Sequence, residues 1–439
     1  PVRARRGWSE EHKKAQQIEA EKKRVARRET ADTLFDRYIH EGLDENSAKR
    51  LETEWNRRFN NMVNPDYSKL PLYVDGMSVY KGSEPFTLYE QQIKGISFLS
   101  NKGNGLLAYD VGVGKTAAGI VATVNQIQTG RATRPLIIVP KSVYSKWTRD
   151  IQQLFPNIPV NDLGNFSDKH LAKYRTDEFG LSIPEKSISV CTIEALQRIS
   201  FTDSSISGHL FEDFSNLLGG IDDDGSDRKK KLQEEMIIES VGHASQTKEG
   251  FVFWEHTGFD HVTVDEAHRF KNLYKTPRST EKGKANEYAG LGAGNPSARA
   301  LKLFGITQLV QRNNDNRNVF LLTATPFTNS PLEVYSMLSY MGRERLKEMH
   351  LYNLKSFMDE FAEMKNEWAV DAKGTIQSRQ VMKNFRSLPA LQNLLLEYID
   401  KVDGEEAGVI RPLKFTHIEK LEPTALQKQI IEAETDRML

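Results

Sequence analysis

The sequence is nearly free of cysteine and has no long apolar run. Cys191 is the only cysteine among 439 residues, so no disulfide can form within the chain, as is usual in a reducing compartment. Because Cys191 lies in an apolar segment, we interpret it as a small core residue. No stretch of about 18 apolar residues is present, and no apolar signal segment opens the chain. We therefore expect a cytoplasmic protein that does not cross a membrane.

A net charge is also lacking, because Lys plus Arg and Asp plus Glu both total 60. Any surface for nucleic acid must then be local. The stretch 1–30 is rich in basic residues, which leaves two interpretations open: a solvated helix, or a basic arm that lies on nucleic acid. Apolar residues at helical spacing follow it. We predict a helical, basic N-terminal extension over 1–62 and a connector over 63–85.

An initiator methionine is missing, since the first residue is Pro1. We expect the chain to be either a processed product or an excerpt of a longer polypeptide. With 439 residues it exceeds the size that one hydrophobic core usually supports, so two or three structural units are expected.

From Leu88 onward, helix-like segments alternate with short apolar runs. The runs are continuous rather than alternating, as expected of strands that are covered on both faces. This pattern predicts an α/β fold with a doubly wound parallel sheet and right-handed crossovers. The five predicted strands are Leu106–Tyr109, Leu136–Val139, Ile188–Thr192, His261–Val264 and Val319–Thr323.

The first run ends in a glycine-rich turn, which predicts a phosphate-binding loop at the carboxyl end of that strand. Lys115 would reach the β- and γ-phosphates of ATP, and the hydroxyl of Thr116, where a helix is expected to start, would hold Mg²⁺. The general pattern has a glycine where this chain has Tyr109, so an ordinary glycine turn is the alternative. The backbone N–H groups that would close on the phosphates belong to Gly112, Val113 and Gly114.

An acidic pair, Asp265-Glu266, follows the fourth run and would lie at the same edge of the sheet as the phosphate loop. Asp265 is predicted to join the Mg²⁺ shell, and Glu266 to orient and deprotonate the attacking water. Lys115, Mg²⁺ and Glu266 would form the minimum that phosphoryl transfer needs from one lobe. Solvated acidic surface is the alternative interpretation.

Longer segments resemble the superfamily 2 helicases and, among them, the Swi/Snf-type translocases of double-stranded DNA. Asp265-Glu266-Ala267-His268 is similar to their Asp-Glu-Ala-His box, and Leu321–Asn329 resembles their Leu-Leu-Thr-Gly-Thr-Pro-Leu-Gln-Asn element. The resemblance covers about residues 86–342 and implies the first of two RecA-like lobes, with an insertion at about 200–259. Apolar residues at helical spacing predict a helical segment over 343–410, and the resemblance implies the start of a second lobe over 411–439.

The resemblance implies roles for further residues. Leu88–Gln92 is similar to the family's Leu-Arg-Pro-Tyr-Gln, so Gln92 is expected to read the adenine base. Trp147 belongs to an element that touches the DNA backbone in the family, with core packing as the alternative. Coupling of hydrolysis to movement is implied for His268, Thr323 and Thr325, and DNA-backbone contact for Lys141, Ser142 and Thr192.

The implied function is movement along double-stranded DNA driven by ATP hydrolysis, with ATP and Mg²⁺ as cofactors and no base-sequence preference. In the family, arginines of the second lobe meet the charge that develops on the γ-phosphate, so we expect the isolated chain to hydrolyse ATP hardly at all. The alternative is a structural or packaged segment that retains the nucleotide-binding fold and acts through protein contacts.

A narrower resemblance rests on Glu54–Asn60, Tyr67 and Gly76-Met77. These residues are similar to large phage and plasmid polypeptides that join an adenine methyltransferase to such a helicase, the antirestriction proteins delivered with phage DNA among them. The resemblance implies a second helicase lobe and a methyltransferase domain as partners in the same longer polypeptide. It also implies the bacterial host cytoplasm or the virion as location.

Overall fold

The computed structural model describes most of the chain, as two compact units of residues 1–63 and 64–439. The described residues are 30, 34–35, 37–59, 66–176, 180–217, 251–274, 296–327, 331–351, 353–370, 376–409 and 423–430. The basic arm predicted near the N-terminus and most of the predicted insertion lie outside these residues.

The first unit is helical where it is described. It contains a π-helical turn, Tyr38–Gly42, and helix α2, Glu45–Phe59. Asp44 precedes α2, and its Oδ1 accepts a hydrogen bond from the backbone N–H of Ser47 at 2.9 Å. Such a bond satisfies one of the donors that a helix N-terminus leaves unpaired. The described residues of the predicted N-terminal extension are thus mainly helical.

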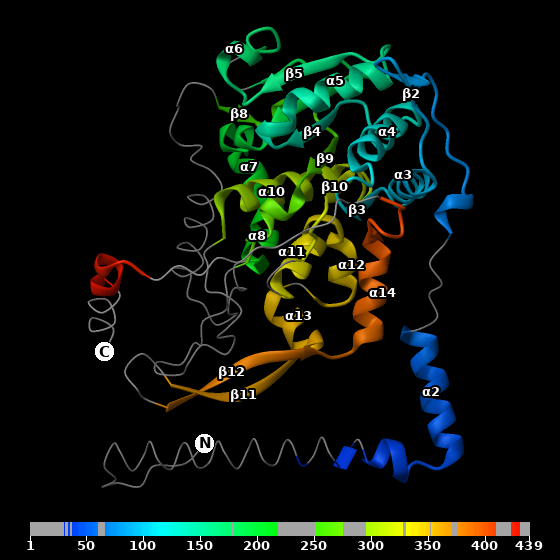
Figure 1. The fold of residues 1–439 in the computed structure, drawn as a ribbon, viewed down its shortest axis with the longest axis vertical. Coiled ribbons are helices and arrows are strands. Elements are labelled where there is room, and N and C mark those ends of the chain that lie inside the picture. The colour runs from blue at the N-terminus through cyan, green and yellow to red at the C-terminus, as the bar shows by residue number, and fades with distance from the viewer. Residues whose placement is uncertain are drawn as a thin grey trace. The chain divides into compact units, whose positions relative to one another are not determined.

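A seven-stranded parallel sheet forms the centre of the second unit (Figure 1). The strand order is β13-β3-β10-β9-β4-β6-β5. The predicted parallel α/β fold is therefore confirmed, and each of the five predicted runs is a strand. The strands are β3 (Asn104–Tyr109), β4 (Pro135–Val139), β5 (Val160–Gly164), β6 (Ile188–Thr192), β9 (His261–Asp265), β10 (Val319–Thr323) and β13 (Ile399–Val402).

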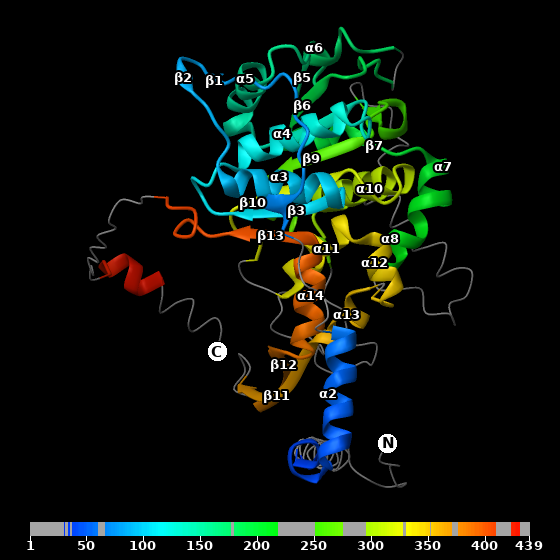
Figure 2. The same cartoon turned by 90° about the vertical axis from the view of Figure 1, so that its right-hand side faces the viewer.

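The two edge strands of this sheet, β5 and β13, were not predicted. Their sequences, Val-Asn-Asp-Leu-Gly and Ile-Asp-Lys-Val, contain polar residues because an edge strand has only one neighbour. Figure 2 shows β13 running beside β3, with which it pairs in parallel from Ile399 opposite Leu106 to Val402 opposite Tyr109.

Helices cover both faces of the sheet. One face packs on α3, α4 and α5, and its apolar cluster includes Ile96, Ile120 and Trp147. Helices α10 and α11 pack on β9 and β10 from the other side (Figure 1). None of the described helices is both long enough and apolar enough to cross a membrane. The bounds are α3 (Glu90–Lys102), α4 (Lys115–Gln128), α5 (Tyr144–Leu154), α6 (Asp168–Leu171), α10 (Ala298–Asn313) and α11 (Pro331–Met341).

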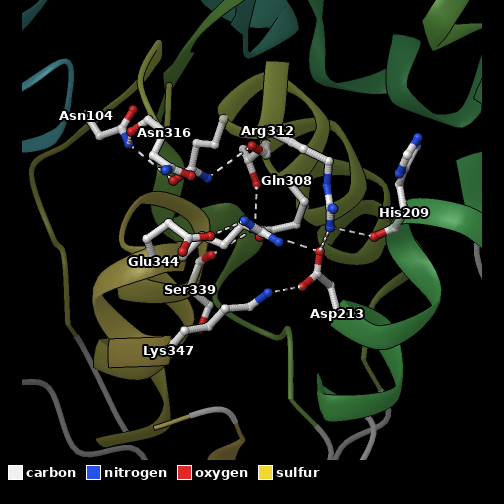
Figure 3. A network of polar contacts seen from close by, with 12 residues as sticks. Asn104, His209, Asp213, Gln308, Arg312, Asn316, Ser339, Glu344 and Lys347 are labelled. Carbon is white, nitrogen blue, oxygen red and sulfur yellow. Dashed lines mark hydrogen bonds and ion pairs between the residues drawn. The ribbon is translucent and has the colours of Figure 1, made fainter. Parts of the chain in front are cut away.

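Side-chain amides satisfy the last carbonyl groups of α11, which the helix itself leaves unpaired. Gln308 Nε2 donates to Ser339 O at 3.1 Å, and Asn104 Nδ2 donates to Met341 O at 2.9 Å. Asp213 lies nearby and receives ion pairs from Arg312, Arg343 and Lys347, at 3.2, 3.5 and 3.6 Å (Figure 3). These contacts attach helix α8, Phe211–Leu217, to α10 and to helix α12, Arg343–Glu348.

The segment after Gly342, which was predicted to be helical, contains both helices and strands. Helices α12, α13 (Leu354–Phe361) and α14 (Leu388–Tyr398) alternate with an antiparallel hairpin of β11 (Ala362–Val370) and β12 (Ile376–Phe385), and the chain then returns to the main sheet as β13. In the segment predicted as the second lobe, a helix over 425–430 is described.

Small elements complete the second unit. The described part of the predicted insertion contains α7 (Asp203–Ser205), α8 and the parallel pair of β7 (Ile199–Ser200) with β8 (Val252–Phe253). The connector contains the antiparallel pair of β1 (Tyr80–Lys81) with β2 (Glu84–Pro85). Short 3-10 turns lie at Tyr67–Lys69, Lys141–Val143, Ile193–Arg198, Trp254–His256 and Ala267–Phe270, and a π-helical turn at Ile206–Leu210.

Candidate nucleotide-binding site

Three neighbouring strands end at one site. The predicted phosphate loop follows β3, Asp265 ends β9, and Thr323 ends β10, which lies between them. Because the strands are parallel, their carboxyl ends meet at one edge of the sheet, where ligands of open α/β sheets bind. The fold therefore brings together residues that are about 150 to 200 positions apart in the sequence.

The phosphate loop takes a backbone conformation that favours glycine. Gly112 and Gly114 have φ angles of 91° and 94°, in the left-handed region that other residues rarely adopt. Val113 between them is buried in the core and fixes the loop to the body of the lobe. Helix α4 begins at Lys115, one residue before the predicted start at Thr116. The N–H groups of its first turn are therefore available to an anion.

Lys115 folds back onto the loop. Its Nζ donates to the carbonyl oxygens of Tyr109 and Asp110, at 2.8 and 3.3 Å. Burial lowers the pKa of Lys115, and the negative charges of Glu266, Asp265 and Asp110 act in the opposite direction. The lysine and the predicted acidic pair are therefore close enough to interact electrostatically.

Gln92, which was expected to read adenine, is only 2% exposed. Its Nε2 donates to Gly114 O at 3.2 Å, and its Oε1 accepts a hydrogen bond from Tyr89 N at 2.8 Å. Both ends of the amide are thus engaged within the chain, and one of them holds the phosphate loop. Tyr89, at the N-terminus of α3, is exposed beside it. Contact of Gln92 with a base stays a prediction.

Asp265 is buried at the end of β9 and is held from two directions. Trp147 Nε1 donates to its Oδ2 at 2.9 Å, and the backbone N–H of Glu266 donates to its Oδ1 at 3.0 Å. Burial raises the pKa of Asp265, whereas the Trp147 bond lowers it. Trp147 itself is 1% exposed within the core cluster. Trp147 therefore packs in the core, which is one of its two interpretations. Its hydrogen bond to Asp265 was not predicted from the sequence.

Glu266 adopts the left-handed backbone conformation, with φ of 52°, and its side chain is partly exposed. Its Oε2 lies 3.2 Å from His268 Nδ1, which in turn lies 2.9 Å from Thr323 Oγ1. Thr323 Oγ1 also accepts a hydrogen bond from Thr325 N at 3.2 Å. Burial lowers the pKa of His268, and Glu266 opposes that shift. These contacts connect the acidic pair to the end of the neighbouring strand.

The three predicted DNA contacts differ in accessibility. Lys141 and Ser142 are exposed in the turn after β4. Thr192, at the end of the adjacent strand β6, is 5% exposed, and its Oγ1 has no hydrogen-bond partner among the described residues. A DNA backbone could reach the first two without any change in the chain, whereas Thr192 would have to become accessible.

Comparison with known families agrees with this arrangement. The model of a family described as "SNF2-related domain" matches residues 54–282, just over half of the chain. The chain belongs to the SNF2-related family. A second model, described as "Probable helicase domain", matches residues 210–402 of this SNF2-related chain.

Curated relatives of the SNF2-related chain are much longer than it is. Defense against restriction protein B of Escherichia phage P1 is 26% identical over 405 residues, which are 82% of this chain and 17% of the relative. Chromatin structure-remodeling complex subunit snf21 of Schizosaccharomyces pombe is 30% identical over 120 residues, 26% of this chain and 10% of the relative. The chain thus spans less than a fifth of the length of either relative.

Among solved structures, the Sulfolobus solfataricus SWI2/SNF2 ATPase core in complex with dsDNA is 15% identical, with a TM-score of 0.40 over 74% of this chain and 46% of that one. The Pyrococcus furiosus Hef helicase domain is 14% identical, with a TM-score of 0.28 over 56% of this chain and 34% of that one.

The donor groups at the site of the SNF2-related chain fit Mg²⁺ bound with a nucleotide. Mg²⁺ prefers oxygen ligands and is usually held by one or two carboxylates together with substrate phosphates. Each carboxylate oxygen of Asp265 accepts one hydrogen bond and keeps a further lone pair, and Thr116 lies in the first turn of α4. Within the described part of the chain, no cluster of three or more His, Cys, Asp or Glu could hold a metal by itself.

Proposed function

We propose that this SNF2-related chain binds ATP with Mg²⁺ at the phosphate loop and hydrolyses it, and that hydrolysis drives movement along double-stranded DNA. Family membership supports nucleotide use. The observation that carries the proposal is the electrostatic proximity of Lys115 to both Asp265 and Glu266, across three adjacent strands. A buried carboxylate, Asp265, beside the half-buried Lys115 and the partly exposed Glu266 is typical of a functional site with shifted pKa values.

Each residue has a defined part in the proposed reaction. Gly112 and Gly114 shape the loop whose N–H groups bind phosphate oxygens, and Lys115 leaves its carbonyl partners to bind the β- and γ-phosphates. Asp265 and Thr116 would hold Mg²⁺, which neutralises negative charge on the phosphates when it is bound.

Glu266 is the proposed general base. Its side chain is partly exposed, so a water molecule can reach it, and His268 at 3.2 Å restricts its orientation. The contact of His268 with Thr323 at 2.9 Å supports the predicted coupling role, because movement at the end of β10 would shift His268 and, through it, Glu266.

DNA binding is proposed through the exposed turn with Lys141 and Ser142, which would contact phosphates rather than base edges. The phage P1 relative is named for defence against restriction. We propose that the present chain likewise acts within a larger phage or plasmid antirestriction polypeptide that carries a second lobe, in a bacterial cytoplasm.

Nucleotide binding and turnover test this proposal separately. Calorimetry with ATP and Mg²⁺ should detect nucleotide binding by the 439-residue chain. The Lys115→Ala variant should lose this binding, whereas a Lys169→Ala variant, in which an exposed lysine of α6 is replaced, should retain it. Phosphate release should be slow for this chain and should rise with duplex DNA, by roughly 10³-fold or more, once the second lobe supplies its arginines. Equal affinity of the Lys115→Ala and wild-type chains would overturn the site. Binding without turnover in the longer protein would favour the alternative of a structural segment.

A further inference from the structure

The phenol of Tyr109 connects the phosphate loop to the edge strand β13. Tyr109 is the last residue of β3 and is fully buried. Its Oη donates to Asp400 Oδ2 at 2.6 Å and lies 2.8 Å from Gln91 O. Lys94 Nζ binds the other oxygen of Asp400, Oδ1, at 2.9 Å. A residue that departs from the usual glycine of the loop is therefore fixed by a charged group nearly 300 positions away.

Backbone contacts join the same two segments. The N–H of Asp110 donates to Val402 O at 3.1 Å, and the N–H of Gly404 donates to Asp110 Oδ2 at 3.4 Å. The turn after β13 also packs on the loop, because Val409 Cγ1 lies 3.1 Å from the position that a Cβ of Gly112 would occupy. Figure 2 shows β13 at this edge, next to β3.

The space around the phenol is made by a glycine. A Cβ placed on Gly95 of α3 would overlap the Oη and Cζ atoms of Tyr109. Gly95 is buried inside a helix, where glycine is unfavourable by about 1 kcal/mol relative to alanine. Its presence is explained by the need to admit the Tyr109 ring.

These contacts determine where Lys115 is held. Its Nζ binds the carbonyl oxygens of Tyr109 and Asp110, which belong to the two residues that β13 fixes, one through its side chain and one through its backbone. A shift of Tyr109 would therefore move an acceptor of the phosphate-binding lysine.

We propose that Tyr109 and Asp400 are positioning residues of the nucleotide site: the bond between them fixes the backbone of the loop from which Lys115 and the phosphate-binding N–H groups extend. This inference rests on the proposed nucleotide binding. It also makes β13 part of the site, so that displacement of the edge strand would weaken nucleotide binding without any change in a residue that touches the ligand.

A double-mutant cycle on the 439-residue chain tests the proposal, with a non-hydrolysable ATP analogue and Mg²⁺ as the probe. Tyr109→Phe and Asp400→Ala should each weaken binding by about three- to tenfold, the range that corresponds to the net contribution of one typical intramolecular hydrogen bond. Both variants remove the same bond, and Asp400→Ala also removes the ion pair with Lys94, so the double variant should lose no more than Asp400→Ala alone. Asp400→Asn retains an acceptor oxygen and should recover most of the affinity.

Two further variants separate positioning from stability. Tyr335→Phe removes a comparable buried phenol, whose Oη donates to Leu351 O at 2.6 Å away from the loop, and should lower the melting temperature without weakening nucleotide binding. Gly95→Ala favours the helix itself but displaces Tyr109, and should weaken binding.

The proposal would be overturned if Tyr109→Phe lowered the melting temperature but left the nucleotide affinity unchanged. The proposed nucleotide site itself would still stand in that case if Lys115→Ala abolished binding. Losses that multiply in the double variant would also overturn it, because the two residues would then act separately. Absence of binding by the wild-type chain would remove the proposed function and this inference with it.

Discussion

Trp147 Nε1 donates a hydrogen bond to Asp265 Oδ2 at 2.9 Å, so the core of the helical layer reaches the proposed Mg²⁺ ligand directly. Burial raises the pKa of this carboxyl group, and the indole bond is the strongest of the contacts that lower it. The tryptophan therefore helps to keep Asp265 ionised, which Mg²⁺ binding requires.

Trp147→Phe keeps an aromatic core residue but removes the donor. We expect about tenfold weaker Mg²⁺-dependent nucleotide binding, the scale for a hydrogen bond to a charged group. Because the pKa of Asp265 rises further without the bond, the affinity should also decline at a higher pH than in the wild type. Calorimetry between pH 5 and pH 8 measures both effects, and Trp254→Phe, a buried tryptophan elsewhere, is the matched control. An unchanged pH profile would contradict the electrostatic role.

Glu266→Gln tests the general base. The amide preserves the size of the side chain but cannot accept a proton, so nucleotide affinity should stay close to that of the wild type while turnover falls by about 10²-fold or more. The measurement is phosphate release by a polypeptide that includes the second lobe, with duplex DNA present. If the variant turns over at a near-normal rate, another residue must activate the water.

The regions that sequence analysis predicted well are those with strong local patterns. Continuous apolar runs such as Ile188–Thr192 identified all five central strands, and the order of glycines and Lys115 located the turn between β3 and α4, whose binding of phosphate stays a prediction. Strands β5 and β13 were missed because their polar residues conceal an edge position. The bond from Tyr109 to Asp400 joins residues 291 positions apart, and no local pattern indicates such a pairing. The one signal in the sequence is that Tyr109 stands where the general phosphate-loop pattern has a glycine.

The buried imidazole ring of His261 should make the stability of the folded chain depend on pH. Its ring is fully buried at the start of β9, edge-on to Phe320, with Nε2 2.9 Å from Thr263 Oγ1. Burial lowers the pKa of His261 to about 3, below its usual value of about 6.5 in an unfolded chain. The folded state therefore binds fewer protons than the unfolded state between these values, so stability is complete above about pH 6.5 and falls as the pH decreases toward 3.

Between pH 7.5 and pH 5, this one histidine should cost about 2 kcal/mol of the free energy of unfolding. Urea unfolding at the two pH values measures the loss, and His261→Gln should show a loss that is smaller by that amount. An equal pH dependence in the two proteins would mean that His261 is not held neutral.

DNA binding should be weak, insensitive to base sequence and dependent on salt. The exposed Lys141 can neutralise a phosphate of the DNA backbone, and a contact of that kind does not read base edges. Titration of fluorescently labelled duplexes of two unrelated sequences, at about 50 and 200 mM salt, should give equal affinities for the two sequences and lower affinity at higher salt. Lys141→Ala should reduce the slope of log affinity against log salt by about one, whereas Lys169→Ala should leave it unchanged. A strong preference for one duplex, or affinity that does not change with salt, would exclude a backbone-tracking surface at this turn.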